Sequence, residues 1–320
     1  TIDEPLTESE TSLPLEGVRV LDLTWVLAGP FATRMLADLG ADVIRLQNEE
    51  HSTLVNRPDY PYYFVWGRGK RSATLDMKHP DALATIRKLI ENCDVLIENY
   101  SAGVLDGWGL DWQTVKEWNP RLVYVSMSGC GHDGPWRHVI SYAPTIHAIC
   151  GITHLTNFAD RGDVGPGFSL NDHLAGFAAA TSAMAALLSR DASGLGQHID
   201  MAQLEVGTYS IGPAALNWLS NGVIAQPEGN RDGLHDHVPN EVYPSLDGFV
   251  AITASSDAEW ERLRELLETD LLGLLPTEEE RRVHRDQIDQ VIGDWVGNKE
   301  SSVVVELLQS IAVPAGKVQD

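Results

Sequence analysis

The chain has 320 residues, of which 43% are hydrophobic, and its 46 acidic against 23 basic side chains give a formal net charge of −23. This length and apolar content suit two domains, or one large domain with an appendage. The acidic excess disfavours binding to nucleic acid or to an anionic membrane surface, so we expect neither as a partner.

Strands and helices alternate in the first half of the chain. Strands are predicted at 18–23, 42–46, 94–98 and 122–127, and helices at 30–39, 80–92 and 112–118. This alternation is typical of the α/β fold class, a parallel sheet with helices on both faces. Such sheets bind ligands beyond the carboxyl ends of their strands, which are followed here by 24–30, 99–103 and 128–135.

A long, nearly uncharged helix is predicted to begin near Asn171 and Asp172 and to end before Gly194. The apolar residues Leu174, Phe177, Met184, Leu187 and Leu188 have the spacing of a buried helical stripe. The partial positive charge at a helix start favours an ionised Asp172, which could act as a nucleophile beside backbone N–H groups that hold a substrate oxyanion. The structural alternative is that the acid simply caps the helix.

The composition changes after about residue 210, where Gly, Pro and Asn become frequent. Beyond it a strand is predicted at 249–253, and helices at 256–268, 278–296 and 302–311. We expect a polar tail or linker at 1–14, a large domain at 15–215, a connecting segment at 216–241 and a smaller domain at 242–320.

Several other kinds of site are incomplete. His235 and His237 could be two metal ligands, but no third ligand has a recognisable spacing, so we expect no metal. The three cysteines are far apart, and with no signal-peptide pattern at the start they favour a cytoplasmic location. The clearest basic cluster for an anionic ligand is formed by Arg68, Lys70 and Arg71.

Five segments are more specific together than any of them is alone. They are PLEGVRVLDLTWVLAGPFATRMLADLGADVIRL, KRSATLDMKHPDA, DVLIENY, NPRLVYVSMSG and GLGQHIDMA, in this order. In order and spacing they resemble the class III CoA-transferases, the family of formyl-CoA transferase and the carnitine CoA-transferases. The resemblance covers residue 15 to the end and implies a Rossmann-like parallel sheet with helices on both faces plus a smaller α+β domain.

In this family a catalytic aspartate heads the long helix, and the matching residue is Asp172, which favours the nucleophile over the cap. The resemblance implies contacts with coenzyme A at Val26, Ala28, Leu75 and Asn99, a place near the thioester for Tyr142, and a place near the nucleotide for Arg71. A phosphate contact of Arg71 is our inference. Three departures weaken individual contacts: Gln47-Asn48 at the end of the second strand, Gly107 in place of an arginine, and SYA at 141–143 in place of GYD.

The implied reaction exchanges CoA between an acyl-CoA and a small carboxylic acid, through an aspartyl anhydride and an aspartyl-CoA thioester. CoA is then a substrate and no permanent cofactor is expected. Members of the family form interlocked dimers and continue beyond the point where this chain ends. We therefore expect a homodimer, or half of a tandem or heteromeric assembly, with a smaller domain truncated before its return to the large domain.

Two other functions remain open. The related α-methylacyl-CoA racemase shares the fold and shuttles a proton with a histidine and an aspartate, but this chain has Tyr142 where that histidine is expected. Tyrosine is a poor general base at neutral pH because the ordinary pKa of a phenol is about 10. A non-catalytic partner subunit that binds CoA is the other alternative.

Overall fold

The computed structural model describes residues 12–48, 61–162, 164–231, 237–267, 275 and 277–319. They form two compact units, one within Thr1–Thr153 and Val164–Gly212, the other within His154–Asp163 and Pro213–Asp320. Residues 1–11 of the predicted tail lie outside the described residues, as does His235 of the candidate metal ligands.

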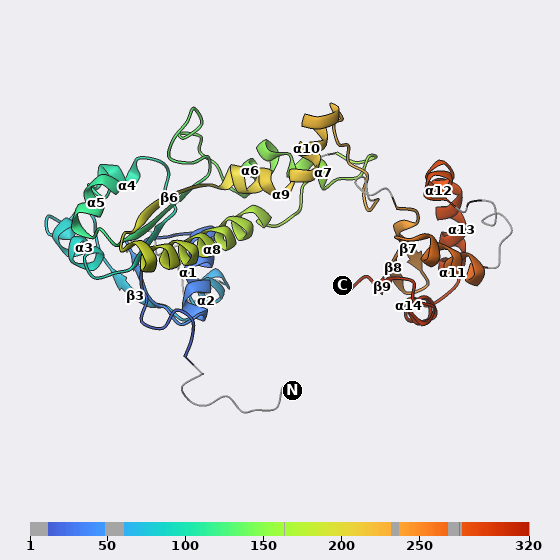
Figure 1. Cartoon of the computed structure of the whole chain (residues 1–320), viewed down its shortest axis with the longest axis horizontal. Helices are drawn as coiled ribbons and strands as arrows, with labels where there is room; N and C mark the ends of the chain where they lie inside the picture. The colour runs from blue at the N-terminus through green and yellow to red at the C-terminus, as the bar shows by residue number, and fades with distance from the viewer. Residues whose placement is uncertain are drawn as a thin grey trace. The chain divides into compact units, whose positions relative to one another are not determined.

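The first unit is built on a six-stranded parallel sheet with the strand order β3-β2-β1-β4-β5-β6 (Figure 1). Its strands are β1 (Arg19–Asp22), β2 (Asp42–Gln47), β3 (Arg71–Thr74), β4 (Val95–Glu98), β5 (Val123–Ser128) and β6 (Gln197–Ala202). This is the Rossmann order, so the predicted fold class is confirmed. The order reverses between β1 and β4, which is the place where sheets of this kind bind ligands, in a crevice beyond the carboxyl ends of the strands.

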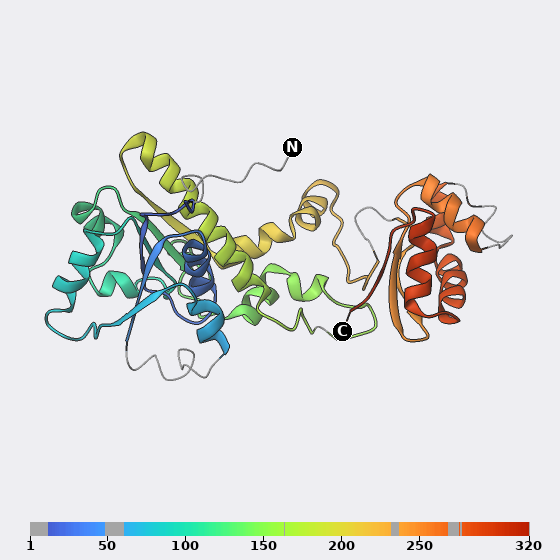
Figure 2. The same ribbon diagram turned by 90° about the horizontal axis from the view of Figure 1, so that it is seen from below.

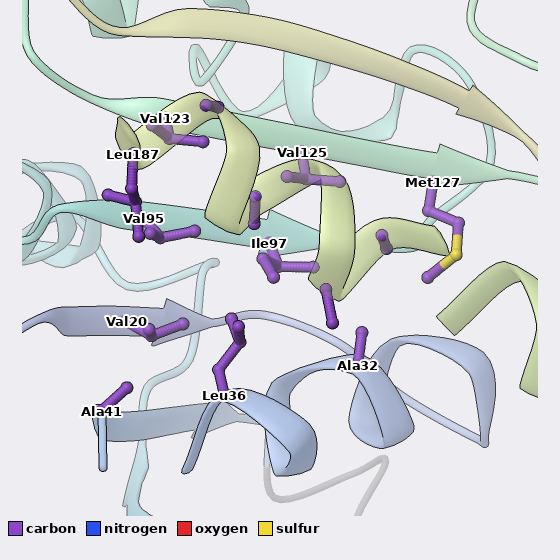
Figure 3. Packing of buried hydrophobic residues seen from close by; sticks show 14 of the residues in the cluster. Val20, Ala32, Leu36, Ala41, Val95, Ile97, Val123, Val125, Met127 and Leu187 are labelled. Carbon is purple, nitrogen blue, oxygen red and sulfur yellow. The ribbon is translucent and has the colours of Figure 1, made fainter. Parts of the chain in front are cut away.

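Helices cover both faces of this sheet, as predicted. On one face lie α1 (Ala28–Asp38) and α8 (Leu170–Ser193), and on the other α3 (Ala82–Ile90), α4 (Val104–Gly107) and α5 (Trp112–Trp118). Helix α2 (Pro61–Gly67) contacts α1, and a separate small cluster is formed by α6 (Ala143–Cys150), α7 (Ile152–Leu155) and α9 (Gln203–Ser210). Because strand residues alternate between faces, Val20 and Val95 pack with α1 and α8, whereas Leu21 and Leu96 pack with α3, α4 and α5. Figure 3 shows the first of these cores.

The long helix α8 buries small side chains instead of the predicted large ones. Phe177 and Leu188 are 57% and 73% exposed. The side chains that α8 buries in the core are Ala175, Ala179, Ala180, Ala183, Ala186 and Leu187. A Cβ atom at Gly176 would lie 2.6 Å from the carbonyl oxygen of Ala28. The backbones of α1 and α8 therefore approach too closely for large side chains, and the predicted stripe is wrong at Phe177 and Leu188.

The second unit contains a three-stranded antiparallel sheet of order β7-β8-β9, with helices packed on one of its faces (Figure 2). Its elements are β7 (Asn240–Ser245), β8 (Gly248–Thr253), α11 (Asp257–Leu267), α12 (Glu278–Val283), α13 (Arg285–Gly297), α14 (Ser301–Ser310) and β9 (Ala315–Lys317). Val250, Trp260 and Ile292 share its core, which confirms the predicted smaller α+β part. The helix predicted at 278–296 is broken at His284.

One further helix, α10 (Gly212–Asn221), begins where the sequence becomes rich in Gly and Pro. Within the described ranges, no helix is both long and apolar enough to cross a membrane.

Candidate active site

One side chain ties the loop after β1 to the loop after β4. Asn99 Oδ1 accepts a hydrogen bond from the Trp25 N–H at 2.8 Å, and its Nδ2 donates to the Trp25 carbonyl at 3.0 Å. The amide therefore spans the point where the strand order reverses. Asn99 was predicted to contact CoA, but both ends of its amide are engaged by the chain itself.

A buried ion pair at the end of β1 supports the loop that follows this strand. Asp22 is fully buried at the end of β1, and its carboxylate accepts from Lys70 Nζ at 3.0 Å and from Thr33 Oγ1 at 2.6 Å. Burial would raise the pKa of Asp22, but the charges of Lys70 and Arg45 outweigh it and hold the pKa below its usual value. Lys70 also donates to the carbonyl of Pro30 at 2.9 Å, which anchors the first turn of α1.

The three basic residues predicted as a cluster for an anionic ligand, Arg68, Lys70 and Arg71, are not brought together in the structure. Arg68 pairs with Asp38 at 2.7 Å, Lys70 is buried on Asp22, and Arg71 pairs with Asp42. Arg71 lies level with Ile44 in β2, and its guanidinium reaches back to Asp42, the first residue of that strand, on the side of the sheet away from the crevice. The three cations are neighbours in sequence but diverge in space, and each is balanced by a carboxylate.

Val26 has a strained backbone, with a φ of 60°. A β-branched residue rarely adopts this left-handed conformation, which costs about 1–3 kcal/mol. The strain persists because Trp25 is clamped on one side and α1 begins at Ala28 on the other. Ala28 itself is buried against α8 and does not line the crevice, although a CoA contact was predicted for it.

The first turn of α8 is fixed by Asn171, which is fully buried. Its backbone N–H donates to His147 Nε2 at 3.0 Å, and its Nδ2 donates to the Gln203 carbonyl at 3.1 Å. Burial lowers the pKa of His147, which favours the neutral imidazole that can accept this bond. Ser169 occupies the N-cap position, so Asp172 is the third residue of the helix and does not serve as its N-cap.

The Asp172 cleft, a hollow of about 200 Å³ at the carboxyl edge of the sheet, brings four predicted site residues together. They are Val26, Asn99, Tyr142 and Asp172. Burial raises the pKa of Asp172 to about 6, and the charge of His173 and a hydrogen bond from Ser169 oppose the rise. The carboxylate is still mostly ionised near pH 7, and is more basic than an exposed aspartate.

Leu75 lies in a second, smaller hollow of about 60 Å³. Tyr100 lines both this hollow and the Asp172 cleft, so the two adjoin at its ring. Gln47 is in the same wall, with Nε2 donating to Ser72 Oγ at 2.8 Å. Leu75 and Asp172 therefore lie in neighbouring hollows, while Arg71 is brought to neither.

Glu98 and His132 were missed by sequence reasoning. Glu98 is fully buried, its Oε1 lies 3.3 Å from His132 Nε2, and its Oε2 accepts from the Tyr100 N–H at 2.8 Å. Burial raises the pKa of Glu98 to about 8, so the carboxyl is mainly protonated at neutral pH. The signal was an acid inside the IENY motif, directly before the clamp Asn99.

Among the described residues, no group of three or more His, Cys, Asp and Glu side chains could hold a metal ion. Of the two candidate metal ligands only His237 is described, and its Nδ1 lies 2.8 Å from Glu278 Oε1.

A Rossmann-ordered sheet with an ionisable, partly desolvated aspartate at its carboxyl edge defines an α/β enzyme that acts on a bound ligand. The model of CoA-transferase family III matches residues 15–320, and the chain belongs to this family. It is thus a transferase that moves coenzyme A between an acyl-CoA and an acid. The resemblance seen in the sequence is confirmed.

Relatives along nearly the whole chain agree. It is 32% identical to the succinate–glutarate CoA-transferase of Agrobacterium fabrum, over 95% of this chain and 80% of that protein. It is 30% identical to the beta subunit of the succinyl-CoA–L-malate CoA-transferase of Chloroflexus aurantiacus, over 97% and 79%. A CAIB/BAIF family protein from Brucella suis has a similar structure, with a TM-score of 0.86, 30% identity, and coverage of 97% of this chain and 85% of that one.

Proposed function

We propose that Asp172 is the nucleophile that carries the acyl group and then CoA during transfer. The observation that carries this proposal is the Asp172 carboxylate in the cleft, with its pKa raised to about 6 by burial. A desolvated carboxylate is more reactive than a hydrated one, and it remains ionised at neutral pH.

Asp172 Oδ attacks the thioester carbon of the donor, the C–S bond breaks, and an aspartyl anhydride and CoA thiolate result. The thiolate attacks the aspartyl carbonyl and releases the donor acid, leaving an aspartyl-CoA thioester. The acceptor carboxylate attacks this thioester and expels the thiolate. The thiolate then attacks the acyl carbon of the acceptor and restores Asp172. One thioester replaces another, so no ATP is needed.

We propose that the CoA arm passes Tyr100. The adjoining hollows place Leu75 on one side of this ring, and Val26, Tyr142 and Asp172 on the other. The smaller hollow is too small to enclose a base, so the adenine would lie across its mouth. Asn99 and Ala28 act indirectly, by holding the loop after β1 and its helix. Arg71 is left out of this proposed site because it pairs with Asp42 and lines neither hollow.

The geometry gives no support to the racemase alternative. No histidine belongs to the wall of the Asp172 cleft as far as the described chain goes. His173 follows Asp172 directly, but its Nδ1 lies 2.8 Å from the Ser169 carbonyl, and its ring packs on Phe31 and Trp66. A proton shuttle needs a base on each face of the substrate carbon.

We propose that the chain works in an assembly with a second copy or a related subunit. Helix α10 buries none of its side chains, and Leu216, Trp218 and Leu219 are each more than half exposed. Large apolar side chains gathered on one helix favour a partner surface. Sedimentation of Trp218→Glu beside the natural protein tests the assembly, and an unchanged mass would contradict it.

The two compact units support a large domain at 15–215 and a smaller one at 242–320.

Both relatives are named for dicarboxylic acids, so we propose a dicarboxylic acid as one of the two substrates. The test of the proposed nucleophile is trapping with hydroxylamine during turnover of succinyl-CoA, followed by peptide mass spectrometry. A hydroxamate is expected on Asp172, and none is expected in Asp172→Asn. Asp191→Asn, in the exposed last turn of the same helix, is the matched control and should still be trapped at Asp172. A protein that binds CoA but never forms the adduct would be a non-catalytic subunit.

A further inference from the structure

The Asp172 cleft contains one cation. Among its described wall residues, only Asp172 and Arg137 carry a formal charge. Arg137 belongs to the segment between β5 and α6, which lines the cleft at Ser128 and Gly129, and again at Arg137 and from 139 to 142. Both ends of this segment are fixed at the cleft, so its arginine is held over the site.

The guanidinium of Arg137 has no carboxylate partner within the described chain. Its Nε donates to His138 Nε2 at 3.0 Å. Several other arginines of the same unit pair with carboxylates, as Arg68 does with Asp38 at 2.7 Å and Arg190 does with Asp94 at 2.9 Å. Arg19 and Arg121 donate to backbone carbonyls instead, but neither lines the cleft. Arg137 is also exposed, so a ligand can reach it.

A chain with a net charge of −23 repels an anionic substrate, and the ionised Asp172 adds to this inside the cleft. At physiological salt the screening length is about 8 Å, so the charges nearest the ligand decide. A guanidinium can bind a carboxylate through two parallel hydrogen bonds, which a methyl group in the same place cannot form.

We infer that Arg137 recognises the distal carboxylate of a dicarboxylic acyl group while Asp172 reacts at the other end of that group. This inference rests on the proposed function, because it takes the acyl chain to lie in the Asp172 cleft. The cation favours dicarboxylic over monocarboxylic substrates, and it offsets the repulsion between the distal carboxylate and Asp172. Arg137 is therefore a specificity-determining residue.

The test compares succinyl-CoA with butyryl-CoA, which has a methyl group in place of the distal carboxylate. Binding is measured by calorimetry on the full chain carrying Asp172→Asn, with and without Arg137→Gln. Loss of Arg137 should raise the Kd of succinyl-CoA by about 10- to 100-fold more than that of butyryl-CoA. Arg137→Lys keeps the charge without the planar fork and should give an intermediate ratio. Arg121→Gln removes an equal charge elsewhere and should leave the ratio unchanged.

Two binding results would overturn the inference: an unchanged ratio, or an equal loss for succinyl-CoA, butyryl-CoA and free CoA, which would assign Arg137 to the CoA moiety. Because the readout is binding, it decides the role of Arg137 even if no aspartyl adduct is found. If the protein exchanges only monocarboxylic acids, the role of Arg137 in specificity is refuted, but the proposed role of Asp172 as the nucleophile is not affected.

Discussion

The amino and carboxyl edges of the large sheet balance their charges in different ways. At the amino edge, Arg71 pairs with Asp42 and Arg190 pairs with Asp94, each where water or a partner offsets the charge. At the carboxyl edge, the pKa values of Asp172 and Glu98 are raised by burial to about 6 and about 8. Val26 is strained at the same edge. The carboxyl edge therefore holds carboxyl groups whose burial raises their pKa, as is common at functional sites.

The largest effect expected is on activity. Asp172→Asn should lower CoA exchange by at least about ten-thousand-fold, because the nucleophile is lost. In the natural protein, kcat/KM should rise with pH through an apparent pKa near 6, the pKa of Asp172, as the carboxylate ionises. A flat profile between about pH 5 and pH 7 would contradict this assignment.

Asp172→Asn should also have a larger free energy of unfolding than the natural protein. The pKa of Asp172 lies above its ordinary value of 3.8, so ionisation costs stability above about pH 6. An asparagine avoids this cost, which is on the order of 2 kcal/mol, and the gain should disappear below about pH 4. Urea unfolding at several pH values measures it, and a loss of stability near pH 8 would contradict the account.

Breaking an ion pair should lower the free energy of unfolding by different amounts at the two edges. Lys70→Met leaves Asp22 charged and buried without its partner, and should lower the free energy of unfolding by about 3–5 kcal/mol. Arg71→Met breaks an exposed pair and should cost less than about 1 kcal/mol. Denaturant titrations of the two variants give the comparison, and equal losses would refute it.

Two asparagine clamps distinguish the edges in activity. Asn99→Ala frees the loop after β1 and should lower kcat/KM by about 10- to 100-fold. Asn119 holds the Ile90 and Cys93 carbonyls at the amino edge through the same kind of amide. Asn119→Ala should lower the free energy of unfolding by an amount similar to that for Asn99→Ala, about 1–2 kcal/mol, but should leave kcat/KM unchanged. If both variants lose activity alike, Asn99 has no particular role at the site.

The smallest effect concerns the strained turn. At Val26 a glycine should be more stable than an alanine by about 1 kcal/mol, because φ is positive there. At the exposed helical Thr85 the order should be reversed. Melting temperatures of the four variants provide the measurement. If alanine were more stable than glycine at Val26 as well, the turn would not be strained.

Most strands of the large sheet could be predicted from the sequence, because strands such as Val95–Glu98 are largely apolar runs between helices. Neither β3 nor β6 was predicted. β3 is an edge strand whose four residues are all exposed and which is recognisable only by its pairing with β2, and β6 buries only its last two residues. The stripe on α8 failed for a related reason. Periodicity indicates which face is buried, but the close approach at Gly176 decides which side chains fit there.

For the site, matching segments indicated Asp172, Val26 and Tyr142, which the cleft brings together. Arg71 lines neither hollow. Arg68 and Lys70 precede β3, which begins at Arg71, and each of the three cations pairs with a different carboxylate, so a run of cations in the sequence need not form one surface. Glu98 could not be assigned, since its pKa depends on burial that only the folded chain creates.

The most direct test of the central claim follows one oxygen atom. Turnover with an acceptor acid labelled with heavy oxygen in its carboxylate should leave that isotope in the Asp172 side chain, because the bridging oxygen of the second anhydride stays on the enzyme. Mass spectrometry of the peptide that contains Asp172 should show the gain, and Asp191 should remain unlabelled. An unlabelled Asp172 after many turnovers would mean that the acyl group never passes through it.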